Sequence, residues 1–152
     1  ASDAPNATPW NGSCYFVIGR GTGLAWSAAA SACATYSPES RLVSIGSAEE
    51  QALLEATFFP SVGDYWIGLS LADIDADPPS VACRVVADFC PFGWVDGTPL
   101  TYTNWALRDE DDVEPNYTGG CVRLQLDDRA WGDFTCTTQL PAICEAAQLD
   151  AR

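Results

Sequence analysis

The chain has 152 residues and a formal charge of −14, with 21 acidic side chains against seven basic ones, all of them arginine. Histidine is absent, which excludes Ser-His-Asp and Cys-His catalysis and every metal site that uses imidazole. The strong negative charge argues against a nucleic-acid partner, because nothing in the sequence could form a stripe that neutralises phosphates.

The N-terminal third of the chain predicts an arm, a strand and a helix. Residues 1–12 contain Pro, Asn and Gly without periodicity and are predicted to form a flexible arm. The apolar run at residues 14–18 is typical of a strand. Residues 24–36 are rich in alanine, with apolar side chains at helical spacing, and predict an amphipathic helix that buries Cys33.

A second helix follows closely. Residues 42–45 predict a brief strand. Ser47 and Glu50 have the spacing of a capping box, in which the serine caps backbone N–H groups and the glutamate reaches back. We therefore predict a helix from Ala48 to about Phe58, which Pro60 stops.

The rest of the chain reads as short strands joined by long loops. Residues 65–69 are strongly apolar and predict a central strand, whereas residues 71–92 have the composition of a loop, with Cys83 and Cys90 as an internal staple. Helices segregated from strands of this kind indicate an α+β domain. The remaining predicted strands and turns are a turn at 94–97, a strand at 99–102, a strand at 121–126, a turn at 127–129, and strands at 130–136 and 141–144.

An acidic segment lies between two of these strands. Five carboxylates fall within the six residues from Asp109 to Glu114. Oxygen ligands clustered on an irregular loop are what a hard cation such as calcium requires. The alternative is a solvated acidic loop that is kept extended by repulsion between its carboxylates. The acidic surface as a whole is likewise compatible with binding cations or mineral faces, or with solubility alone.

The cysteines and sequons favour a secreted or cell-surface protein. Seven cysteines in a chain of this size suggest an oxidising compartment, and the odd number leaves at least one thiol free or paired with another chain. No apolar run reaches the roughly 18 residues that would cross a bilayer. The N-terminus lacks the pattern of a signal peptide and reads as a processed end. Three N-x-[ST] sequons are possible glycosylation sites, at Asn6, Asn11 and Asn116.

Seven motifs occur together in one order and resemble a C-type lectin-like domain over residues 13–146, which leaves residues 147–152 as a C-terminal tail. The resemblance implies two helices, antiparallel sheets and a long irregular loop region stapled by disulfides. The motifs are Trp26-x-x-Ala-x-x-x-Cys33, Leu42-Val-Ser-Ile-x-Ser-Ala-Glu-Glu-Gln51, Trp66-Ile-Gly-Leu69, Trp94-x-Asp-Gly-x-Pro-Leu-x-Tyr-x-Asn-Trp105, Glu114-Pro-Asn116, Trp131-Gly-Asp133 and Ala142-Ile-Cys-Glu145.

The resemblance also implies the disulfide pairing. Cys33 would pair with Cys144, and Cys121 with Cys136. Cys83 and Cys90 would form an extra staple that is not part of the usual pattern. Cys14 is left over, because the partner it has in the longer form of the family is missing. It is then either a bridge between two chains or a buried free thiol.

The resemblance places a calcium and sugar site on the acidic loop. Glu114, Asn116 and Asp133 match calcium ligands that also bind the sugar hydroxyls, and the Glu-Pro-Asn order is similar to the mannose, fucose and N-acetylglucosamine type. Two further ligand positions are occupied by glycine, at Gly119-Gly120 and at Gly132. Replacement ligands are available nearby, and glycosylation of Asn116 would remove it as a ligand. The replacement ligands are Asp109, Glu110, Asp111 and Asp112, and the candidate contacts to a sugar ring are Tyr117 and Trp131.

Two functions are consistent with these features. The first is a secreted, calcium-dependent, carbohydrate-binding lectin whose partners are glycans or glycoproteins. The second is a structural or assembly subunit of an extracellular matrix, filament or mineral, which uses the scaffold without calcium-dependent sugar binding and self-associates, with Cys14 as the candidate link between chains. An enzyme is not expected, because carboxylates bunched on one loop bind cations more often than they act as acid and base.

Overall fold

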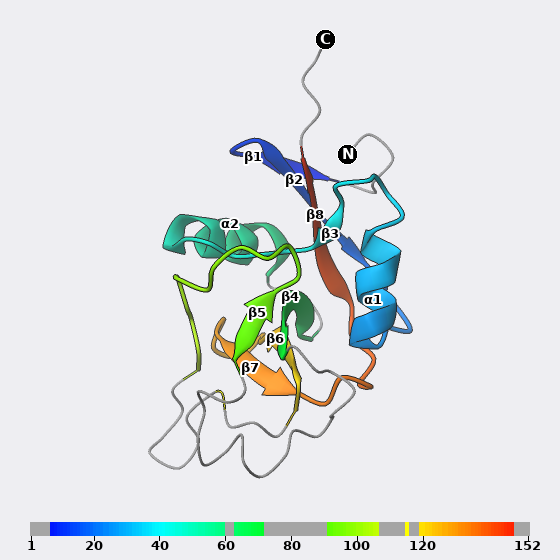
Figure 1. The fold of residues 1–152 in the computed structure, drawn as a ribbon, viewed down its shortest axis with the longest axis vertical. Coiled ribbons are helices and arrows are strands. Elements are labelled where there is room, and N and C mark those ends of the chain that lie inside the picture. The colour runs from blue at the N-terminus through cyan, green and yellow to red at the C-terminus, as the bar shows by residue number, and fades with distance from the viewer. Residues whose placement is uncertain (1–6, 60–62, 72–90, 107–114, 116–118, 148–152) are drawn as a thin grey trace.

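The computed structural model describes residues 7–59, 63–71, 91–106, 115 and 119–147, and its strands form one mixed sheet (Figure 1). The sheet order is β1-β2-β8-β4-β6-β7, while β3 pairs with β8 and β5 pairs with β4. The strand bounds are β1 Thr8–Trp10, β2 Ser13–Ile18, β3 Arg41–Leu42, β4 Tyr65–Leu71, β5 Phe92–Trp94, β6 Cys121–Leu124, β7 Trp131–Phe134 and β8 Ala142–Ala147.

One strand pair departs from the predicted antiparallel arrangement. β4 and β8 run parallel, with Trp66 opposite Ala142. The other pairs among the eight described strands are antiparallel. The α+β class is confirmed, and the sheet is mixed because it contains this one parallel pair of strands.

The helices are α1, Trp26–Cys33, and α2, Ala48–Phe58, which lie on opposite sides of the central strands (Figure 1). α2 has the predicted bounds, since Ser47 Oγ accepts the Glu50 N–H at 3.1 Å and the Glu50 carboxylate accepts the Gly46 N–H at 2.8 Å. α1 is shorter than predicted. Leu24 pairs with Leu140 in a β-bridge instead, through N–H···O bonds of 2.9 and 3.0 Å in the two directions.

Two stretches predicted to be irregular contain strands. Within the predicted arm, β1 forms a hairpin with β2, and its two-residue turn is Asn11-Gly12, with φ of 46° and 84°. Positive φ at both positions is the geometry that Asn-Gly favours in hairpins. The second strand is β5, which pairs with β4 where a loop and turn were expected. The strand predicted at residues 99–102 is absent, and these residues are irregular.

The two faces of the sheet carry separate hydrophobic clusters. One gathers under α2 and includes Tyr15, Leu54 and Trp131. The other gathers under α1 and includes Trp26 and Trp66. Both disulfides implied by the resemblance are present, Cys33–Cys144 across the α1 cluster and Cys121–Cys136 next to β6 and β7. No helix in the described ranges has the length and apolar character needed to span a membrane.

Candidate functional site

The sugar-binding site implied by the resemblance includes Asp133, which is the predicted ligand that lies within the described residues. Asp133 lies on β7 opposite Val122 of β6 and is only 3% exposed. Its Oδ2 accepts the N–H of Gly119 at 2.9 Å. A Cβ at Gly119 would lie 2.0 Å from the carbonyl of Phe134, so only glycine fits here. This hydrogen bond of Asp133 thus holds the segment just before β6 against β7.

Two ligand positions of the family contain glycine, and the structure shows what surrounds them. A Cβ at Gly120 would make ordinary contacts, with Cys136 Sγ at 3.5 Å. A Cβ at Gly132 would lie 3.1 Å from the side chain of Gln125, which is itself only 3% exposed. Gln125 therefore fills the space beside Gly132 where the resemblance leads one to expect a liganding side chain.

These residues do not fit a calcium ion by themselves. Calcium takes 6–8 oxygen ligands, whereas Asp133 is the only predicted ligand in the described ranges. In those ranges no group of three or more acidic or cysteine side chains is placed to hold a metal. The other predicted ligands and contacts lie outside the described residues, as do Cys83, Cys90 and the sequon residue Asn6. These ligands and contacts are Asp109, Glu110, Asp111, Asp112, Glu114, Asn116 and Tyr117.

Trp131 is part of the core and not a sugar contact. Its ring is fully buried and stands edge-on to Trp94, Tyr102 and Trp105 at centroid distances of 5.4, 5.8 and 5.8 Å. Its Nε1–H donates to Gln51 Oε1 at 3.0 Å. The Ala106 N–H in turn donates to the Trp131 carbonyl at 2.9 Å. This aromatic cluster supports residues 102–106, which lead into the acidic segment.

Cys14 and Asn11 belong to the β1–β2 hairpin. Cys14 is a free thiol and is 6% exposed. A disulfide to a second chain would need this sulfur at the surface, so burial favours the free-thiol alternative. Asn11 lies exposed in the β1–β2 turn, where glycosylation stays a prediction.

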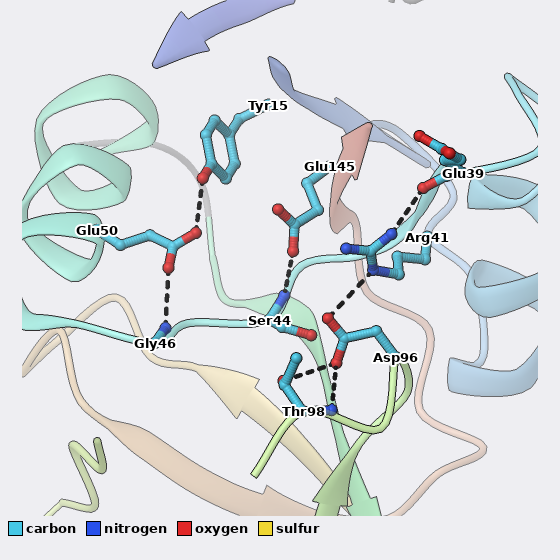
Figure 2. Close-up of polar contacts among 9 residues, drawn as sticks. All are labelled: Tyr15, Glu39, Arg41, Ser44, Gly46, Glu50, Asp96, Thr98 and Glu145. Carbon is cyan, nitrogen blue, oxygen red and sulfur yellow. Dashed lines mark hydrogen bonds and ion pairs between the residues drawn. The ribbon is translucent and has the colours of Figure 1, made fainter. Parts of the chain in front are cut away.

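A polar cluster that the sequence did not reveal lies between β8, α2 and the turn after β5 (Figure 2). Tyr15 Oη donates to Glu50 Oε2 at 2.6 Å, and the Ser44 N–H donates to Glu145 Oε1 at 2.8 Å. Arg41 Nε lies 3.4 Å from Asp96 Oδ2. The residues of this cluster other than Tyr15 line a cavity of about 340 Å³. One feature of the sequence could have revealed this cluster: Glu145 follows Cys144 in a strand otherwise made of apolar residues.

Burial dominates the acid–base behaviour of this cluster. Burial raises the pKa of Glu145 to about 7, although the Ser44 N–H and the Arg41 charge oppose this and the nearby Glu50 and Asp96 reinforce it. Burial followed by the hydrogen bond to Glu50 raises the pKa of Tyr15. Burial would also raise the pKa of Asp96, but hydrogen bonds, chiefly from Thr98, and the Arg41 charge together outweigh it and the pKa is lowered. Glu145 therefore changes charge near neutral pH.

Comparison with known proteins decides the family. The family model for the Lectin C-type domain matches residues 22–146. The chain belongs to the C-type lectin family. Members of this family are binding proteins without enzymatic activity, so the expectation that the chain is not an enzyme is confirmed.

Two of the similar proteins match most of the chain. The alpha-N-acetylgalactosamine-specific lectin of Patiria pectinifera is 32% identical over 149 residues, which are 93% of this chain and 78% of that protein. The secretory phospholipase A2 receptor of Mus musculus is 30% identical over 122 residues, 80% of this chain, and this match spans only 7% of the receptor.

Solved structures share the fold. The carbohydrate-recognition domain of cow CD23, studied in the presence of GlcNAc2Man3 oligosaccharide, has a TM-score of 0.70 and 29% identity, with 97% of this chain and 98% of that chain covered. A calcium-independent type II antifreeze protein has a TM-score of 0.69 and 26% identity, with 96% and 95% covered. These similar structures therefore include a carbohydrate-recognition domain and a protein described as calcium-independent.

Proposed function

We propose that this C-type lectin domain is a secreted carbohydrate-binding lectin. The observation that carries the proposal is the match to the Patiria pectinifera lectin over 93% of the chain. The two buried disulfides support an extracellular setting, because such bonds persist in oxidising compartments. Glycans or glycoproteins are the expected partners.

We further propose that sugar binding depends on calcium held chiefly by the acidic segment. Glu114 and Asn116 would be the ligands shared with the sugar, with Asp133 at the edge of the site and further oxygens from Asp109, Asp111 and Asp112. A bound calcium would supply coordination positions that two vicinal sugar hydroxyls can occupy. The Glu114-Pro115-Asn116 order supports a preference for mannose, fucose or N-acetylglucosamine.

Isothermal titration calorimetry tests both proposals. Mannose is expected to release heat at millimolar calcium, since extracellular calcium modules bind in the range of about 10⁻⁴–10⁻³ M. The heat should disappear with a chelator and in a Glu114→Gln variant, while N-acetylgalactosamine serves as the competing sugar. Equal heats with and without chelator would overturn the calcium dependence but keep the lectin. A larger heat from N-acetylgalactosamine would overturn the mannose-type preference.

A second candidate is a structural or assembly role that uses the scaffold without calcium-dependent sugar binding. The observation in its favour is the pair of glycines at positions 120 and 132, with Gln125 packed beside the second. The similarity to an antifreeze protein that is described as calcium-independent also supports this candidate. Absence of heat with every sugar, together with concentration-dependent sedimentation, would favour this candidate. Assembly through a disulfide of Cys14 would first require the buried sulfur to become exposed.

A further inference from the structure

Arg41 lies between two carboxylates that can each pair with it. Arg41 and Glu145 are directly opposite each other in the β3–β8 pair, which brings their Cβ atoms to about 5 Å. On the other side, Arg41 Nε lies 3.4 Å from Asp96 Oδ2. Figure 2 shows the guanidinium reaching toward Asp96, with Glu145 on the neighbouring strand. One positive charge thus lies beside both a strand carboxylate and a turn carboxylate, and the Arg41 Nη1–H also donates to the Glu39 carbonyl at 2.8 Å.

The two carboxylates differ in how freely they can move. Glu145 is 5% exposed on β8, next to the Cys33–Cys144 disulfide, and its carboxylate is tied to the Ser44 N–H. Asp96 belongs to the turn after β5, where it accepts the Thr98 N–H at 3.0 Å and the Thr98 hydroxyl at 2.7 Å. A change in pairing would therefore move the turn and leave the strand in place.

The other charged groups of the cavity already have partners. Glu50 of α2 accepts the Tyr15 hydroxyl from β2 and the Gly46 N–H. With Glu145 protonated, Glu50, Asp96 and Arg41 leave a net charge of −1. When Glu145 loses its proton, the net charge becomes −2 in a space of about 340 Å³. Among the described residues that line this cavity, Arg41 carries the positive charge that can respond.

We propose that the proton on Glu145 decides whether Arg41 pairs with Asp96, and hence how firmly the turn at residues 95–98 is held against β3. With the proton bound, the guanidinium stays on Asp96 and the turn is fastened. Without it, the guanidinium moves toward Glu145 and the turn loosens. The turn continues into the segment that carries Tyr102 and Trp105 onto Trp131. The proton on the buried Glu145 is therefore coupled to the segment that leads into the acidic residues. This coupling requires neither sugar nor metal.

The balance of forces on Glu145 places this change near neutrality. Burial raises its pKa to about 7 even against the stabilising Ser44 N–H and Arg41 charge. Asp96, whose pKa is lowered, stays ionised throughout. Only one of the two competitors for Arg41 thus titrates in this range.

NMR titration of the whole chain from pH 4 to pH 9 tests the proposal. The carboxyl carbon of Glu145 and the amide of Thr98 are expected to shift with one midpoint near pH 7. Above it, the Gly97 and Thr98 amides should exchange about two- to fivefold faster after correction for intrinsic exchange, which is the range expected from losing a partly exposed ion pair. Glu145→Gln should abolish the step at Thr98. Glu39→Gln, the same change at an exposed neighbour of Arg41, should leave it intact.

Arg41→Gln provides a test that does not alter Glu145. The Thr98 amide should then lose its step, while Glu145 still titrates and its midpoint moves to higher pH because the Arg41 charge no longer lowers its pKa. A Thr98 step that persists in either Glu145→Gln or Arg41→Gln would overturn the proposal. A Glu145 midpoint below pH 5 in the unaltered protein would overturn it as well.

Discussion

Replacing Cys33 and Cys144 together by alanine is expected to lower the free energy of unfolding by about 5 kcal/mol. The bridge closes a loop of 111 positions, and a cross-link stabilises the fold mainly by restricting the unfolded chain, by about 4.7 kcal/mol for a loop of 100 residues. Both cysteines are fully buried against α1, so the lost sulfur contacts add to the effect. Urea unfolding monitored by circular dichroism, with a stabilising osmolyte if needed, measures the difference.

The second bridge is the matched control for this prediction. Cys121 and Cys136 are separated by only 15 positions, so their replacement by alanine should cost about 3 kcal/mol. The double variant of Cys33 and Cys144 should therefore be the less stable of the two. If the shorter bridge proved more costly to remove, restriction of the unfolded chain could not be the main contribution.

Replacing Glu145 by glutamine is expected to remove most of the pH dependence of stability between pH 4.5 and pH 7. The pKa of Glu145 rises from 4.5 to about 7 on folding, so in this range the folded state holds the proton more tightly than the unfolded chain. The free energy of unfolding should thus fall as pH rises, by about 3 kcal/mol in total. The glutamine variant should match the unaltered protein near pH 4 and exceed it by up to about that amount at pH 8.

Urea titrations at five pH values between 4 and 8 measure this difference. Glutamine keeps an oxygen that can accept the Ser44 N–H, so the comparison isolates the charge. Glu39→Gln, at an exposed position, should retain the slope of the unaltered protein. Parallel stability curves for the unaltered protein and Glu145→Gln would show that Glu145 does not titrate in this range.

Features set by neighbouring residues could be predicted from the sequence. The Ser47 and Glu50 capping contacts lie within one helical turn, and α2 has the predicted bounds. Features set by distant residues could not. Leu24 leaves the predicted helix because it pairs with Leu140, and the parallel contact of β4 with β8 has no local signal.

The same limit applies to the candidate site. Asp133 lies on a strand, as predicted, but its bond to Gly119 depends on the register of β6 and β7. The glycines at 120 and 132 were visible in the sequence, whereas the side chain of Gln125 beside Gly132 was not. The polar cluster was missed because Ser44 and Glu145, which form one of its hydrogen bonds, are 101 positions apart.

The pairing of β2 with β8 has a further consequence for protein engineering. Ser13 lies opposite Ala147, so the two places where the chain enters and leaves this part of the fold are about 5 Å apart, one strand spacing. A domain whose ends adjoin in this way can be inserted into a loop of a longer protein without forcing the two sides of that loop apart. It can also be circularly permuted by a short linker between the ends, with new termini opened at an exposed turn inside the unit, such as residues 20–22.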